Sequence, residues 1–128
     1  SVISFSFAKS LKDALEIDKR IKQSVPYWQF KDGFISRKYR TAGWPATLML
    51  VNTIGHFCQA GWHHPELEVS YSEVVIKLVT HDIGGVTEKD FVLAERLEEA
   101  ITWRPEWPDA PGNGDESNSS IPPYMLYD

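Results

Sequence analysis

Cysteine and long apolar runs are nearly absent from this chain. Cys58 is the single cysteine among 128 residues, which excludes a framework of internal disulfide bonds and indicates a reducing compartment. The longest apolar run, residues 48–54, is interrupted by Asn52 and Thr53 and is too short to cross a bilayer. The first residues lack the basic and apolar pattern of a secretory signal, so we expect a cytoplasmic protein unless a targeting segment has been removed.

Basic residues are also in the minority. The chain has 13 Lys and Arg residues against 18 Asp and Glu residues, a formal net charge of −5. Neither nucleic acid nor an anionic membrane is therefore an expected partner. Hydrophobic residues make up 42% of the chain and charged residues 24%, which is ordinary usage for a soluble protein that folds as one domain.

Two amphipathic segments predict the first and third helices. In residues 8–23, apolar side chains recur near helical spacing, at Leu11, Leu15, Ile17 and Ile21. The Val25-Pro26 step ends this pattern, because the residue before proline avoids the helical region. The third helix begins after Thr87, which with Asp90 resembles a capping box. Its apolar stripe consists of Phe91, Ala94, Leu97 and Ile101.

The second helix is predicted over residues 45–60. Pro45 suits the first turn, and Gly61 suits the position just past the end. Its apolar residues cover more than one stripe; they are Leu48, Leu50, Val51, Ile54, Phe57 and Cys58. A helix that is apolar on two faces packs on its own sheet and also on a partner. We therefore expect a homo-oligomer, dimer or tetramer, formed through this helix.

Four strands are predicted, in residues 28–30, 34–40, 67–71 and 73–81. Asp32-Gly33 is a hairpin signal between the first two, and Ile83-Gly84-Gly85 is a turn after the fourth. The element order α-β-β-α-β-β-α predicts an α+β fold, in which one four-stranded antiparallel sheet has helices packed on one face.

The composition changes from Arg104 onward, where proline, glycine and serine become frequent. We therefore divide the chain into a domain, residues 1–103, and a tail, residues 104–128. The last residues, 121–127, are apolar and aromatic again, and they would form an exposed hydrophobic patch if they did not pack on the protein. We expect them to dock back on the domain.

Three histidines are the strongest candidates for chemistry. His63 and His64 lie in the loop before the third strand, and His81 ends the fourth. If these two strands pair as a hairpin through Tyr71-Ser72, the start of one meets the end of the other. Histidine titrates near neutral pH, so neighbouring histidines can supply an acid and a base together. That combination suits the loss of water from a carbinolamine.

Other interpretations of the same residues stay open. A His-His pair on a loop is often a solvated structural pair. The three histidines could also hold zinc with Glu66 or Asp82, although none of the common zinc spacings is present. His56, within the second helix, is expected to be a packing or surface residue. No motif marks Cys58 as a nucleophile.

Three stretches together resemble the pterin-4a-carbinolamine dehydratase family. They are Gly-Trp-His-His-Pro-Glu at residues 61–66, Val-Val-Ile-Lys-Leu-Val-Thr-His-Asp at 74–82 and Gly-Gly-Val-Thr-Glu-Lys-Asp at 84–90. The resemblance is close over residues 28–103. It implies an α+β fold and the dehydration of 4a-hydroxytetrahydropterin to quinonoid dihydropterin, with the pterin as substrate and with no metal and no other cofactor.

The resemblance also implies roles for individual residues. His63, His64 and His81 match the family's functional histidines. The residues that would line the pterin pocket are these three with Trp62, Pro65, Thr80 and Asp82. Asp90 matches a family position as a support residue, and Trp28, which could stack at the pocket mouth, is more typical of a core residue.

One position departs from the family pattern. Many members carry glutamate four residues before the first motif histidine, where this chain has Gln59. An amide can still hydrogen-bond a pterin edge, but it cannot act as a carboxylate. Some relatives act instead as non-catalytic partners, either a dimerisation cofactor for a transcription factor or an assembly factor for a carbon-fixing enzyme. This chain keeps all three histidines, which favours the enzyme.

Overall fold

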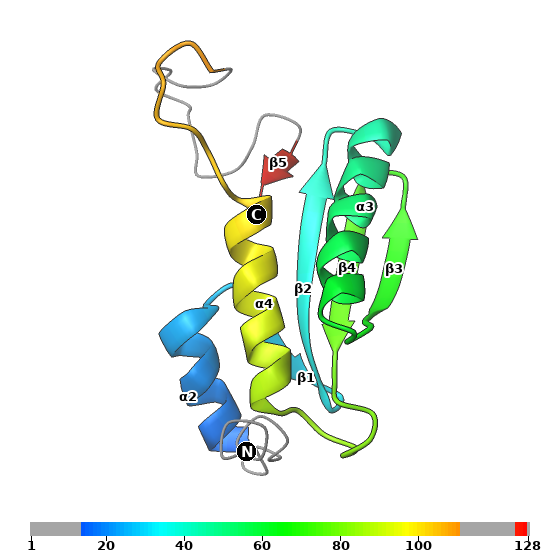
Figure 1. The fold of residues 1–128 in the computed structure, drawn as a ribbon, viewed down its shortest axis with the longest axis vertical. Coiled ribbons are helices and arrows are strands. Elements are labelled where there is room, and N and C mark those ends of the chain that lie inside the picture. The colour runs from blue at the N-terminus through cyan, green and yellow to red at the C-terminus, as the bar shows by residue number, and fades with distance from the viewer. Residues whose placement is uncertain (1–13, 111–124, 128) are drawn as a thin grey trace.

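The computed structural model describes residues 14–110 and 125–127, and it shows one antiparallel sheet with helices on one face (Figure 1). The elements, in chain order, are α2 (Ala14–Ser24), β1 (Gln29–Lys31), β2 (Phe34–Thr41), α3 (Trp44–Ala60), β3 (Glu66–Ser70), β4 (Glu73–Leu78), α4 (Glu88–Ile101) and β5 (Met125–Tyr127). The predicted α+β class and the order α-β-β-α-β-β-α are confirmed. The expected helix start at residue 8 lies outside the described residues.

The strand order along the sheet is β1-β2-β4-β3, with every pair antiparallel. β1 and β2 form the predicted hairpin, and the turn residues Asp32 and Gly33 have φ angles of 55° and 84°. Such positive φ values are what a tight two-residue hairpin needs. β5 also pairs antiparallel with β2, next to Arg40 and Thr41. The division of the chain at residues 103 and 104 stays a prediction.

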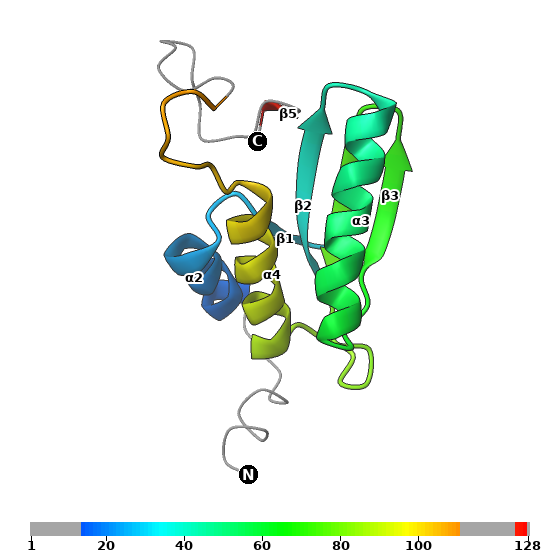
Figure 2. The same cartoon turned by 45° about the horizontal axis from the view of Figure 1, so that its top comes forward.

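Helices α3 and α4 cover one face of the sheet, and α2 lies beside α4 (Figures 1 and 2). Alternate strand residues point into this layer, so Ile35, Tyr39, Val74, Ile76 and Leu78 are all fully buried. The helices contribute a matching apolar set to the same core: Ile17, Ile21, Leu50, Ile54, Cys58, Phe91, Ala94, Leu97 and Ile101. None of the helices in the described part of the chain is long and apolar enough to cross a membrane.

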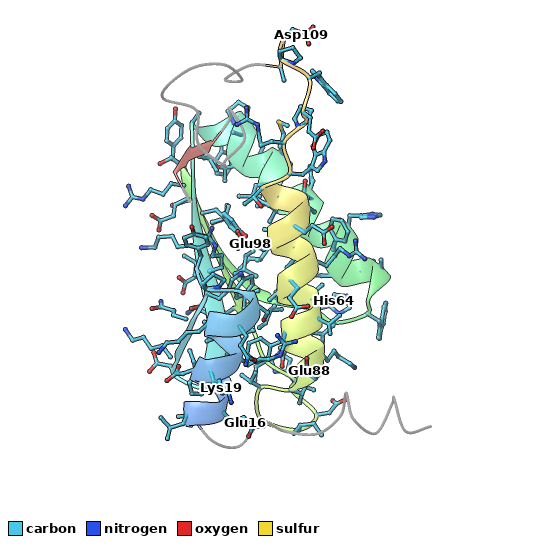
Figure 3. The ribbon with its side chains drawn as sticks, turned by 90° about the vertical axis from the view of Figure 1, so that its left-hand side faces the viewer. Glu16, Lys19, His64, Glu88, Glu98 and Asp109 are labelled. Carbon is cyan, nitrogen blue, oxygen red and sulfur yellow. The ribbon has the colours of Figure 1, made fainter. Side chains whose placement is uncertain are left out.

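A charged cluster lies largely buried between α4 and the sheet, where Figure 3 shows Glu98. Glu98 Oε1 accepts hydrogen bonds from Arg37 Nε at 2.8 Å, from the Tyr39 hydroxyl at 2.8 Å and from Trp28 Nε1 at 3.0 Å. Burial, together with the Glu98 charge, raises the pKa of Tyr39 well above its ordinary value. Trp28 is 3% exposed, so it is a core residue.

Apart from shifts of one residue at other element ends, three details of the sequence prediction are wrong. Leu15 was expected on the apolar stripe of the first helix, yet it is 78% exposed, because only Ile17 and Ile21 face the core. The first strand begins at Gln29 rather than at Trp28. The fourth strand ends at Leu78, so His81 lies in the following turn and not in the strand.

Candidate active site

The chain turns sharply at the C-terminal end of α3, just before the histidine pair. Trp62 N–H donates to the Gln59 carbonyl at 3.2 Å, and His63 N–H donates to the Cys58 carbonyl at 3.0 Å. These two bonds form a Schellman motif, which satisfies carbonyls that the helix leaves free. The residue in left-handed conformation is Trp62, with φ at 49°, and not the expected Gly61, whose φ is −84°. A tryptophan rarely adopts this conformation.

His63 is anchored to a buried carboxylate from α4. Its Nε2 lies 2.5 Å from Oδ1 of Asp90, and the two residues are 8% and 0% exposed. Because a carboxylate accepts hydrogen bonds, Nε2 of His63 is the donor in this contact. Asp90 therefore fixes the orientation of His63.

The second oxygen of Asp90 holds two further groups. Its Oδ2 accepts from Thr87 N–H at 2.8 Å and from the Thr80 hydroxyl at 2.9 Å. The first of these bonds completes the predicted capping box at the start of α4. Thr80 also pairs with Gly85 across the turn that follows β4. One carboxylate thus joins α4, this turn and His63.

His81 lies in the turn next to Thr80, and its side chain is exposed, as is that of Asp82. The β3–β4 hairpin is formed as predicted, with Glu66 opposite Lys77. The loop before β3 and the turn after β4 are therefore at the same end of the molecule, beside the first turn of α4 (Figure 1).

His64 belongs to a second, exposed group. Its Nε2 lies 2.8 Å from Oε1 of Gln59, one turn back on α3. Its ring meets the exposed ring of Trp62 edge to face, with the ring centroids 5.0 Å apart. Figure 3 shows His64 on the opposite side of α4 from Glu98, so the charged core cluster is separate from the candidate site.

A pocket of about 260 Å³ opens beside His63, between the end of α3 and the outer face of α4. Its lining residues are Phe57, Gly61, His63, Lys89, Val92, Leu93 and Arg96. Sequence reasoning missed Lys89, Val92, Leu93 and Arg96. Their spacing along one face of the third helix was the available signal, but nothing in the sequence showed that this face borders the histidines.

The predicted site residues fall into three sets. His63, Thr80 and Asp90 are joined by hydrogen bonds, and His64, Gln59 and Trp62 form the exposed group. The remaining residues, Pro65, His81 and Asp82, lie in the adjoining loop and turn, with Pro65 half-buried. Asp90 is more than a helix cap, because its carboxylate contacts His63 directly.

Two other side chains of α3, Cys58 and His56, take no part in these hydrogen bonds. Cys58 is buried, and burial raises the pKa of its thiol to about 11, which disfavours the nucleophilic thiolate. His56 is exposed on α3 and packs edge to face against Phe57. Among the residues described, no group of three or more His, Cys, Asp or Glu side chains is arranged to hold a metal ion.

Comparisons with known proteins point to one family. The family profile described as pterin 4 alpha carbinolamine dehydratase matches residues 10–100. A protein of Aquifex aeolicus named "Putative pterin-4-alpha-carbinolamine dehydratase" is 40% identical over 65% of this chain and 84% of its own length. A Chloroflexus aurantiacus protein of the same name is 38% identical over 67% of this chain and 91% of its own length.

One solved structure shares the fold. It is described as a transcriptional coactivator/pterin dehydratase from Brucella melitensis, and it superposes with a TM-score of 0.64 at 24% sequence identity. The match covers 70% of this chain and 96% of that one. At this identity the likeness establishes the common fold only.

Proposed function

Because the chain belongs to the pterin 4 alpha carbinolamine dehydratase family, we propose that it dehydrates a 4a-hydroxytetrahydropterin to the quinonoid dihydropterin. In this reaction an acid protonates the departing hydroxyl, the C–O bond breaks and water leaves. A base removes the N–H proton, and the C=N bond forms. General acid–base catalysis of this kind contributes about 10²- to 10⁴-fold in rate.

The observation that carries the proposal is the hydrogen bond between His63 and the buried Asp90 at the end of the fold that also holds His64 and His81. Asp90 keeps His63 in one orientation beside the pocket. A rigidly oriented imidazole can hold a bound substrate in place for proton transfer by the two neighbouring histidines. No metal or further cofactor is part of the proposed reaction.

The contact with Gln59 supports a role for His64 as the base. Since the amide oxygen accepts from Nε2, the unprotonated Nδ1 of His64 is the atom that can take a proton. The exposed His81 is then the acid that protonates the leaving hydroxyl. Trp62, Pro65, Thr80 and Asp82 border these histidines and would contact the pterin.

Stopped-flow absorbance of 4a-hydroxytetrahydropterin dehydration tests this function directly. We expect acceleration over the spontaneous rate, reduced at least 100-fold in His64→Ala and in His81→Ala. Both side chains are exposed, so circular dichroism should show an unchanged fold. His56→Ala, which removes an exposed histidine elsewhere on α3, is the matched control and should keep the full rate. Wild-type turnover in both site variants would refute the mechanism.

The outer face of α3 supports association of the chain with itself. Trp44, Leu48 and Met49 are 45%, 42% and 55% exposed, although the opposite face of the same helix is buried in the core. We propose that this apolar stripe is the contact of a homo-oligomer. A partner-binding role without catalysis would use the same stripe and would leave the histidines dispensable.

Light scattering on Leu48→Glu tests the contact. Burying a new carboxylate in an apolar interface is costly, so the variant should be smaller than the wild-type assembly. Gln23→Glu adds the same charge on the exposed face of α2 and should leave the mass unchanged. A wild-type protein that is monomeric at micromolar concentration would exclude the contact.

A further inference from the structure

The pocket beside His63 is lined by two basic side chains that have no role in the proposed reaction. Lys89 and Arg96 are both exposed, and among the residues that the structure describes they are the only Lys, Arg, Asp or Glu side chains in its lining. No acidic residue of the described part of the chain lines it, although the formal net charge of the protein is −5. A local excess of cationic groups in an acidic protein selects for an anion.

The nearby carboxylates do not neutralise these two cations. Glu88 and Glu95, on the same helix, are both paired with Arg20 of α2. The Asp90 carboxylate is buried and is fully used by His63, Thr80 and Thr87. Within residues 14–110 no ion pair involves Lys89 or Arg96, so both can bind a ligand.

The rest of the lining is apolar. Phe57, Val92 and Leu93 provide side chains that can cover the uncharged part of a substituent, and the volume of about 260 Å³ is at the small end of ligand pockets. The pocket runs along α4 away from His63. Lys89 lies in the first turn of that helix, and Arg96 is seven residues further on, roughly 10 Å of helix.

We propose that this pocket binds an anionic side chain of the pterin substrate, with Lys89 and Arg96 recognising a phosphate or a carboxylate at its end. The inference rests on the proposed function, because it assumes that the pterin ring lies against the histidines. A pterin with a neutral side chain would fill the apolar part and leave both cations unpaired.

Binding measurements with three stable pterins test the proposal. The probes are 6-hydroxymethylpterin, its phosphate monoester and pterin-6-carboxylate, titrated against the full chain by pterin fluorescence at low ionic strength. We expect at least one anionic probe to bind about tenfold tighter than the neutral alcohol, as charge-assisted hydrogen bonds to two cations would provide. Whether phosphate or carboxylate is preferred identifies the natural group.

Variants separate the pocket from the general charge of the protein. In the double variant Lys89→Gln/Arg96→Gln the ratio of anionic to neutral affinity should fall to about one, and in Arg96→Gln alone it should fall in part. Lys22→Gln removes the same charge from the exposed face of α2 and should leave the ratio unchanged. Equal affinity for all three probes would overturn the proposal, as would a preference that survives the double variant or that falls equally in Arg96→Gln and Lys22→Gln.

The failure of this proposal can be told from failure of the proposed function. Equal binding of neutral and anionic pterins, with dehydration still accelerated, would reject only the anionic side chain. Absence of binding by every probe, together with no acceleration of dehydration, would reject both.

Discussion

Nε2 of His63 lies 2.5 Å from Oδ1 of Asp90, although 27 residues separate them in the chain. The same carboxylate caps α4 through Thr87 and holds the Thr80 hydroxyl. The stability of the helix and the orientation of the histidine therefore depend on one side chain. Substitutions at Asp90 and at Thr87 should therefore differ in their effects on the dehydration rate and on the stability of the fold.

Asp90→Asn should lower the dehydration rate about 100-fold, because an amide is a weaker acceptor than a carboxylate and would hold the His63 ring less firmly beside the pocket. It should also lower the free energy of unfolding by about 1 kcal/mol through the weaker cap. Stopped-flow absorbance and urea unfolding measure the two effects.

Thr87→Val is the matched control for Asp90→Asn. It removes the capping hydroxyl and leaves the Asp90 carboxylate beside His63, so it should cost similar stability with less than a tenfold loss of rate. If the rate fell equally in both variants, the carboxylate would have no role beyond the cap.

Gln59→Glu should shift the acid limb of the pH–rate profile to higher pH, by about one unit. A carboxylate 2.8 Å from the His64 ring would favour its protonated form, and a protonated base cannot accept the substrate proton. The profile is measured as kcat/KM against pH. Gln23→Glu adds the same charge on α2 and should leave the acid limb of the pH–rate profile at the same pH. A shift of the alkaline limb alone would assign His64 as the acid.

Arg37→Met should destabilise the fold by about 3 kcal/mol, because it leaves the Glu98 carboxylate beneath α4 without its cation. The Arg37 side chain is only 3% exposed. Lys38→Met removes the neighbouring, largely exposed charge and should change the unfolding free energy by less than about 1 kcal/mol. Urea unfolding compares the free energies of unfolding of the two variants. Equal losses would mean that the Arg37–Glu98 pair contributes no more to stability than an exposed charge.

The Cys58 thiol should make the fold less stable in alkali. Burial raises its pKa to about 11, whereas the unfolded thiol ionises near 9.0. The unfolded state therefore loses its proton first, so stability falls as pH rises from about 9 to about 11 and is unaffected below that range. The difference in unfolding free energy between the wild type and Cys58→Val should decrease from pH 7 to pH 10.5. A constant difference would show that the thiol titrates alike in both states.

Local patterns in the sequence were enough for most of the fold. Asp32-Gly33 produces the β1–β2 hairpin, and Thr87 with Asp90 produces the cap of α4, because both signals act within four residues. In β2, which was expected over residues 34–40, Ile35, Arg37 and Tyr39 alternate along the strand and are all buried. The β3–β4 hairpin then brought the two histidine segments to one end of the sheet.

The sequence by itself thus determined the elements, their order and the end of the fold at which the histidines lie, because periodicity, turns and caps depend on neighbouring residues. Only the tertiary structure decided that Asp90 contacts His63, that Trp62 takes the left-handed position and that Arg96 borders the same pocket as His63. These relationships depend on how α4 packs beside α3. That packing is set by the whole buried core, and no local pattern in the sequence records it.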